Sequence, residues 1–174
     1  GGYEILDKIK GSDMIGWKYN GPFDDLEAQS KEGGYPFVKE KLREKGIRAI
    51  DCHIVIDGGK DNIGNDIVVA GEGTGIVHMA TGCGAIDNKI GKKNNLVEIA
   101  PLDDEAKYLS GFGFLTGKIA TSESTRDEII QYLKDNQLLL YQEDYPHVYP
   151  HCWRSGDELV YRSVDEWYIN MDWR

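Results

Sequence analysis

The side chains that could do chemistry gather in and just after the segment GEGTGIVHMATGCG, residues 71–84. His78 and Cys83 lie within this segment, and Asp87 follows shortly after it. The segment also holds a dense group of the chain's 21 glycines, namely Gly71, Gly73, Gly75, Gly82 and Gly84. Glycine at this density indicates a backbone that adopts positive φ or approaches another group closely.

Two phosphate-binding loops can be tested against this segment, and both fail. In a dinucleotide-binding loop a third glycine would follow Gly73 and Gly75, but His78 stands there and the residues between are β-branched. A Walker-type loop at 91–93 lacks the upstream glycine spacing and the Ser or Thr that follows the lysine. Neither nucleotide class is predicted.

A thiol nucleophile is another possibility, with Cys83 attacking, His78 as base and Asp87 orienting the histidine. One short segment rarely folds into a working triad, and a small buried cysteine is the alternative for Cys83. The pattern alone equally allows Asp87 to stabilise a helix N-terminus and His78 to be structural. These alternatives stay open at the level of residue types.

A metal site is not predicted. His147, His151 and Cys152 are close in sequence, but Ser155 stands where the second cysteine of a structural zinc site would be expected. The three cysteines are odd in number and far apart, which argues against a disulfide framework and favours a reducing compartment, by default the cytoplasm. No apolar run is long enough to span a membrane.

The net charge of −10 has the wrong sign for a protein that holds nucleic acid mainly by neutralising phosphates. A local basic face is still possible around Lys89, Lys92, Lys93 and Arg154. The length of 174 residues suits one domain. Because the chain begins with Gly1 and not with Met, we expect it to be an excised piece.

The elements that must position these residues are expected to be mostly short strands. Helices are predicted over 36–45, after Gly84 as far as Gly91 or Asn94, and over 124–136. Strands are predicted over 47–56, 66–70, 74–80, 96–100, 138–141 and 159–167. This pattern predicts a mainly β fold, with a closed or nearly closed β-barrel core and two or three peripheral helices.

At this point the residues show a family likeness. The run from Gly73 to His78, with Ala80, Gly82, Gly84 and Asp87 after it and Gly91 and Lys93 further on, resembles the GTG-(A/I)-VH-x-A-P-G-x-G-x-D-D-x-x-x-G-x-K block of isoleucyl-tRNA synthetase editing domains. The segment YPHCWRSGDELVYRSVDEWYINM, residues 149–171, is similar to the stretch where that domain rejoins the catalytic domain. The histidine distinguishes the isoleucyl enzymes from the related valyl and leucyl enzymes.

The resemblance implies the barrel of these editing domains and a hydrolase that removes valine from isoleucine tRNA. It implies that Asp87 holds the α-ammonium of the wrong amino acid and that His78 excludes the larger isoleucine side chain. A positioned water would be the nucleophile, and no cofactor is expected. Substrate-binding positions would be Gly73, Thr74, Gly75, Ala80, Thr81 and Gly82. The implied partners are the tRNA acceptor end carrying valine, contacted by Lys89, Lys92, Lys93 and Arg154, and the catalytic domain of a parent synthetase; the module would be monomeric.

The sequence departs from the family pattern in three places. Thr81 replaces a proline, Ile86 replaces the first of two acidic residues, and the threonine-rich strand T-T-T-P-W-T is absent. In the family that strand builds one wall of the pocket. We therefore expect residues 1–174 to be one domain that forms the larger, C-terminal part of the insertion, with a noncatalytic tRNA-docking or structural fragment as the alternative.

Overall fold

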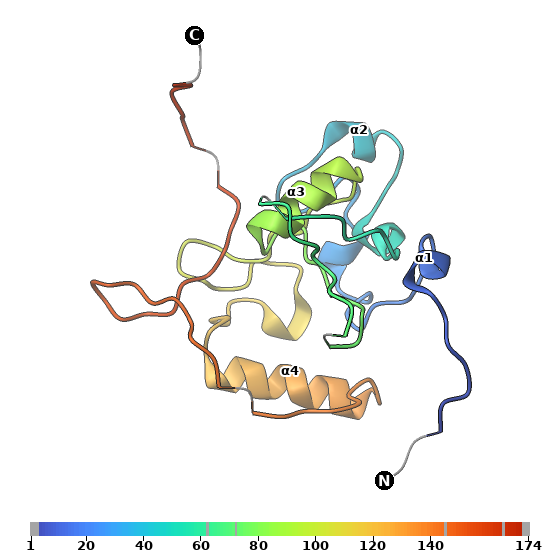
Figure 1. Cartoon of the computed structure of the whole chain (residues 1–174). Coiled ribbons are helices and arrows are strands. Elements are labelled where there is room, and N and C mark those ends of the chain that lie inside the picture. The colour runs from blue at the N-terminus through green and yellow to red at the C-terminus, as the bar shows by residue number, and fades with distance from the viewer. Residues whose placement is uncertain (1–3, 62, 72, 145, 165, 172–174) are drawn as a thin grey trace.

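The computed structural model describes residues 4–61, 63–71, 73–144, 146–164 and 166–171. The helices in these ranges are mostly single turns joined by extended chain (Figure 1). They are α1 (Gly11–Met14), η1 (Glu27–Ser30), α2 (Glu40–Arg43), η2 (Ala49–Cys52), α3 (Ala85–Lys93), η3 (Gly113–Leu115) and α4 (Glu123–Asp135), where η marks a 3-10 helix.

The longest helix, α4, confirms the helix predicted over 124–136. Its N-cap is Ser122, whose hydroxyl accepts a hydrogen bond from the backbone N–H of Thr125 at 3.2 Å. Ile129 packs from α4 against the core. The helix ends where Gln137 takes a positive φ of 59°. The Ser122 cap and the apolar face of α4 therefore specify this helix from nearby residues alone.

Helix α3 also confirms a prediction, since it begins directly after Gly84 and ends at Asn94. Lys92 and Lys93 occupy its last turn, where positive charge interacts favourably with the helix dipole. Asn88 and Gly91 form its buried side. The helix that carries Asp87 is therefore packed along one face.

The prediction over 36–45 is right at its end and wrong at its start. Residues before α2 remain non-helical because they form a turn that is closed by a hydrogen bond from Lys39 N–H to the carbonyl of Gly33, 2.9 Å long. Gly46 ends the helix with a φ of 64°.

The predicted mainly β fold and its barrel are wrong. Among the described residues the extended segments pair only at isolated bridges, and no sheet forms. These bridges are Lys18↔Ile54, Glu32↔Arg48, Tyr35↔Ile99, Lys60↔Asp66, Leu102↔Tyr108, Lys107↔Ile119 and His151↔Glu158.

The β-branched segments lack the burial that would stabilise a sheet. Val68, Val69, Ile76 and Val77 are exposed at 38%, 44%, 60% and 56%, so pairing these segments would gain little from the hydrophobic effect. Turn glycines with positive φ also interrupt the chain at Gly71, Gly73 and Gly75. In these segments the alternation of apolar and polar residues corresponds to extended chain that does not form part of a sheet.

The core consists of two small clusters that share Ile99 at their border. The first contains Leu26, Ala28, Phe112 and Leu115, and joins η1 to η3 with α4 packed on it. The second contains Leu42, Ala49 and Val97, and joins α2 to η2. Residues 96–100 therefore run through the centre of the fold.

The segment after α4 leaves this core and runs along the outside of the molecule (Figure 1). Large apolar side chains in it, including Leu140, Val148 and Trp153, are exposed. Contacts that join it to the rest of the chain include the hydrogen bond from Ser163 to Glu98 at 2.6 Å and the ion pair of Arg162 with Asp104 at 2.5 Å. Across the described residues, no helix combines the length and apolar character needed to cross a membrane.

Candidate functional site

Asp87 lies in the first turn of α3 and is half-buried. Its Oδ2 atom accepts a hydrogen bond from the backbone N–H of Ala80 at 3.0 Å. An ideal Cβ at Gly84 would lie 3.2 Å from the Asp87 carboxyl carbon, so a larger residue at position 84 would crowd the carboxylate. Asp87 is thereby fixed against the end of the glycine-rich segment.

The turn that receives Asp87 is anchored on two sides. The side-chain amide of Asn88 donates to the carbonyl of Thr81 at 2.9 Å, and Asn88 is only 8% exposed. The Thr81 hydroxyl donates to the carbonyl of Val97 at 2.8 Å. Residues 80–82 are thus bound both to α3 and to the central segment 96–100.

Two glycines allow this close packing, as the glycine density predicted. An ideal Cβ at Gly82 would lie 1.9 Å from the Ile99 carbonyl oxygen, which no other residue could tolerate without movement of the backbone. An ideal Cβ at Gly91 would lie 2.5 Å from the Thr81 methyl group. The threonine that replaces the family's proline is therefore accommodated by a glycine in α3.

Cys83 follows this turn and is exposed, so the expectation of a small buried cysteine is wrong. The pKa of its thiol is raised, first by partial desolvation of the sulfur and then by the negative charges of Asp87 and Glu98. A nucleophilic cysteine needs the opposite shift, because the thiolate is the reactive form. The electrostatics of the site argue against a thiol mechanism.

Among the described residues, no hydrogen bond joins His78 or residues 73–77 to this turn. His78 is exposed, and no hydrogen bond or ion pair joins it to Asp87 within the described chain. Gly73 and Gly75 have φ values of 54° and 75° with open space around an ideal Cβ, and among the described residues Thr74 forms hydrogen bonds only with the nearby Ile76. The predicted substrate-binding positions therefore divide into an anchored group, 80–82, and an exposed group, 73–75.

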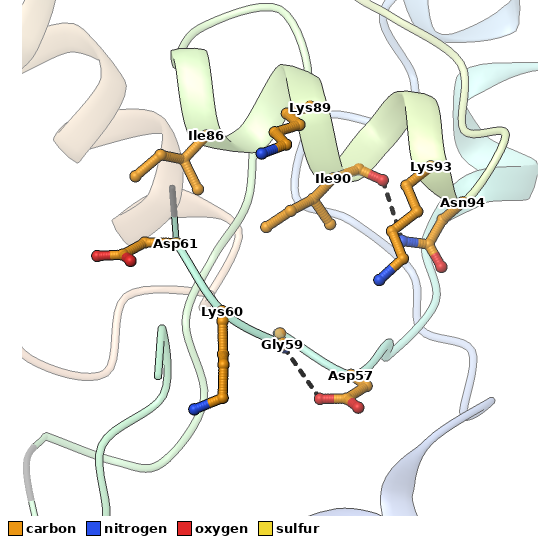
Figure 2. Close-up of a pocket in the computed structure, with 10 residues that line it drawn as sticks. Asp57, Gly59, Lys60, Asp61, Ile86, Lys89, Ile90, Lys93 and Asn94 are labelled. Atoms are coloured by element: carbon orange, nitrogen blue, oxygen red, sulfur yellow. Dashed lines mark hydrogen bonds between the residues drawn. The ribbon is translucent and has the colours of Figure 1, made fainter. Parts of the chain in front are cut away.

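A hollow of about 190 Å³ lies between α3 and residues 57–61, and we call it the α3 hollow (Figure 2). Ile86 and Ile90 line it from α3, with Lys89 and Lys93 beside them. Lys60, Asp57 and Asp61 line it from the facing loop. Two of the lysines predicted to contact tRNA thus share one surface.

The remaining predicted tRNA contacts do not lie in the α3 hollow. Burial lowers the pKa of Lys39, and the positive charge of Lys92 lowers it further against the opposing effect of Glu98. Arg154 stacks on the Trp153 ring, with 4.6 Å from guanidinium carbon to ring centroid. It belongs to a hairpin that is closed by hydrogen bonds between Cys152 and Asp157 and between Leu159 and Pro150.

The structure also shows polar residues that the sequence did not single out. Asn88 orders the turn beside Asp87, and Glu98, 6% exposed, bonds to Ser163 and lies 3.8 Å from the Lys39 ammonium. No spacing or motif marks either residue. The partners of Glu98 lie far away in sequence, and the hydrogen bond from Asn88 to Thr81 depends on how α3 packs on the turn. In the part of the chain that the structure describes, no group of three His, Cys, Asp or Glu side chains could hold a metal ion.

No family model matches the chain, but curated proteins do. It is 34% identical over 170 residues to the isoleucine–tRNA ligase of Methanocaldococcus jannaschii, which covers 97% of this chain and 14% of that ligase. The corresponding enzyme of Sulfolobus acidocaldarius is 33% identical over 168 residues, or 96% of this chain and 14% of the enzyme. The isoleucine–tRNA ligase of Aquifex pyrophilus is 30% identical over 168 residues, which make up 97% of this chain and 28% of that sequence.

These similarities define the class first: the chain is related to aminoacyl-tRNA synthetases. Within that class it belongs to the isoleucyl-tRNA synthetase family, of whose M. jannaschii member it spans 14% of the length. The likeness seen in the glycine-rich block is confirmed at the level of this family.

Proposed function

We propose that this chain is an editing module that hydrolyses the ester between valine and an isoleucine-specific tRNA. The observation that carries the proposal is the Asp87 carboxylate, which is held by the Ala80 N–H at 3.0 Å and forms no ion pair with another described residue. Only one of its oxygens is used in this bond. The negative charge is thus positioned and available to an ammonium group.

The need for such a site follows from the energetics of amino-acid selection. Isoleucine and valine differ by one methylene, which is worth about 1–3 kcal/mol in a binding pocket, and isoleucyl-tRNA synthetase is the standard example of this limit. A second site that accepts valine and excludes isoleucine supplies the missing discrimination. We assign the size limit to His78, which lies in the same glycine-rich segment as Ala80.

The reaction proposed is an ester hydrolysis with water as the nucleophile. The water oxygen bonds to the carbonyl carbon of the aminoacyl group, and the bond from that carbon to the ribose oxygen breaks. The ribose oxygen takes the proton that water gives up, so valine and uncharged tRNA are the products. Asp87 takes no proton in this scheme, because its role is to hold the α-ammonium beside the reacting ester.

A noncatalytic docking role is the second candidate, and a specific observation favours it. Neither of the two hollows described here includes Asp87 or His78, and an ideal Cβ at Gly73 or Gly75 would meet no atom within 4 Å. A chain with this arrangement could bind the acceptor end without completing a pocket for the amino acid.

Deacylation of valyl-tRNA by the chain separates the two candidates. If the editing proposal is right, the chain releases valine from the tRNA. The Asp87→Ala substitution then slows this release about 10- to 100-fold, which is the rate change expected when one charge-assisted hydrogen bond is lost. Asp57→Ala is the matched control, since Asp57 is an acidic residue of the α3 hollow. Binding of tRNA without any valine release by the unmodified chain would support the docking role instead.

A further inference from the structure

A second hollow, of about 260 Å³, lies on another part of the molecule, and we call it the His53 hollow. It is lined by Lys18, Tyr19, Asn20, Ile50, Asp51 and His53. Backbone hydrogen bonds hold its two walls together: Gly16 N–H to the Val55 carbonyl at 2.8 Å, and Tyr19 N–H to the His53 carbonyl at 3.2 Å. The walls are therefore fixed before any ligand arrives.

Two aromatic rings form a stack inside this hollow. The rings of Tyr19 and His53 are nearly parallel, with an interplanar angle of 8° and centroids 5.2 Å apart. Tyr19 is 51% exposed although its ring is stacked against that of His53, so about half of the residue stays accessible to a ligand. The stack offers a flat surface to one more planar group.

The His53 ring packs against Asp24 and Gly21. Its Nδ1 atom lies 3.1 Å from Oδ1 of Asp24, without the geometry of a hydrogen bond, and the second oxygen of Asp24 accepts a hydrogen bond from Gly21 N–H at 2.7 Å. Gly21 is needed here, because an ideal Cβ at that position would lie 2.6 Å from the His53 ring. A rigid platform of this kind loses little entropy when it binds a ligand.

Asp51 and Lys18 are charged side chains in the lining of this hollow. Both oxygens of Asp51 are taken by Arg48, through contacts of 2.9 Å and 3.0 Å from its guanidinium. Lys18 is exposed and forms no ion pair with any carboxylate among the described residues. The positive charge of Lys18 also contributes to the lowered pKa of Asp51, after the hydrogen bonds from Arg48 that are its main cause. Because Lys18 forms no such ion pair, its ammonium group can still turn toward an anionic group next to the stacked ring.

We propose that the His53 hollow binds a nucleobase that carries a phosphate, with the base stacked on the exposed Tyr19 ring and the phosphate near Lys18. Stacking on an exposed aromatic ring is a common way to hold bases with little sequence preference, and Asn20 can both donate to and accept from a base edge. The volume is below the range of roughly 300–1,000 Å³ for drug-sized ligands, which suits one base. This inference goes beyond the proposed editing reaction and does not use Asp87.

The test is a calorimetric titration of the chain, first with 5′-AMP and then, in a separate experiment, with the ribotrinucleotide CCA. We expect Tyr19→Leu to weaken binding of the tighter ligand roughly tenfold, while Tyr19→Phe, which keeps the ring, binds like the parent. Tyr141→Leu is the matched control, since Tyr141 is 72% exposed and lies outside the hollow. Lys18→Gln should weaken AMP and leave adenosine, which lacks the phosphate, unchanged.

The two ligands distinguish the sources of the base. Tighter binding of CCA identifies an RNA strand as the occupant, and equal binding identifies a free nucleotide. The proposal is overturned if the parent chain binds neither ligand, or if Tyr19→Leu binds both as well as the parent does. Asp87→Asn should leave this binding intact, so loss of editing and loss of base binding can be told apart.

Discussion

The carboxylate of Asp87 and the backbone N–H of Ala80 are 3.0 Å apart, and this hydrogen bond joins the first turn of α3 to the end of the glycine-rich segment. Within the described residues the other carboxylate oxygen forms no hydrogen bond. The arrangement fixes the direction of the carboxylate and keeps one oxygen for a ligand. The proposed editing role rests on this geometry.

The close contact at Gly82 predicts a large loss of stability for Gly82→Ala. The new Cβ would lie 1.9 Å from a backbone oxygen of Ile99, which cannot move as a flexible side chain could. We expect the free energy of unfolding to fall by about 3 kcal/mol, the upper end of the usual cost of overpacking. Urea denaturation measures this, with Gly11→Ala as control because nothing lies within 4 Å of that site. Equal stability of the two variants would contradict the packing described.

We expect Asn88→Ala to lower the free energy of unfolding, because the Thr81 carbonyl would lose the hydrogen bond that it accepts from the buried Asn88 amide. A buried group left without its hydrogen bond costs about 1–3 kcal/mol. Asn94→Ala is a matched control, since the Asn94 amide also donates to a carbonyl, that of Ile90 at 3.0 Å, but is exposed. Urea denaturation of the two variants should show a clearly larger loss for Asn88→Ala, and the reverse order would refute the anchoring of the turn.

Two of the three cysteine thiols, those of Cys83 and Cys152, should react in the opposite order to their exposure. Cys83 is more exposed than Cys152, but the pKa of Cys83 is raised while that of Cys152 is lowered, mainly by a hydrogen bond from Ser155. At neutral pH, iodoacetamide should therefore label Cys152 several-fold faster, as followed by mass spectrometry.

The same experiment probes the position of Asp87. Removing its charge in Asp87→Asn should lower the pKa of the Cys83 thiol and speed its labelling, because the Asp87 carboxylate is one of the causes of the raised pKa. Labelling of Cys152 should not change and serves as the internal control. An unchanged Cys83 rate would mean that the carboxylate does not lie near the sulfur.

Asp51 predicts a pH-dependent contribution to stability. Its hydrogen bonds with Arg48 lower its pKa from 3.8 to about 2, so the ionised form is favoured in the folded chain. The Arg48–Asp51 pair therefore stabilises the folded chain fully when the pH is above 3.8, and this contribution disappears as the pH falls toward 2. Its size is small, because the two side chains are 41% and 38% exposed.

Comparison of the parent with Arg48→Gln measures this effect. The difference in unfolding free energy between the two chains should be constant from about pH 5 upward and should shrink as the pH falls below about 4. A difference that grows on acidification would show that the Asp51 pKa is not lowered in the folded chain.

The sequence allowed the two longest helices to be predicted, but it did not show which extended segments would pair in the tertiary structure. Ser122 and the apolar positions of α4 specify that helix within one segment, and the glycine density predicted the close approach seen at Gly82. Alternating residues such as Val68 and Ile76 predicted strands, but strand pairing depends on distant partners that a single segment does not reveal. The pairing of His53 with Asp24 is likewise set by the tertiary fold.

The most direct test of the proposed function compares two substrates and two proteins. Isoleucine tRNA is esterified with valine or with its α-hydroxy analogue, which has the same shape and no positive charge. The chain and its Asp87→Asn variant, which keeps an acceptor for the Ala80 N–H, are assayed for hydrolysis of both esters. If Asp87 holds the ammonium, Asp87→Asn slows hydrolysis of the valine ester about 10- to 100-fold and leaves the hydroxy ester unaffected. Equal slowing of both esters would contradict the proposed role, because the carboxylate would then act without the amino group.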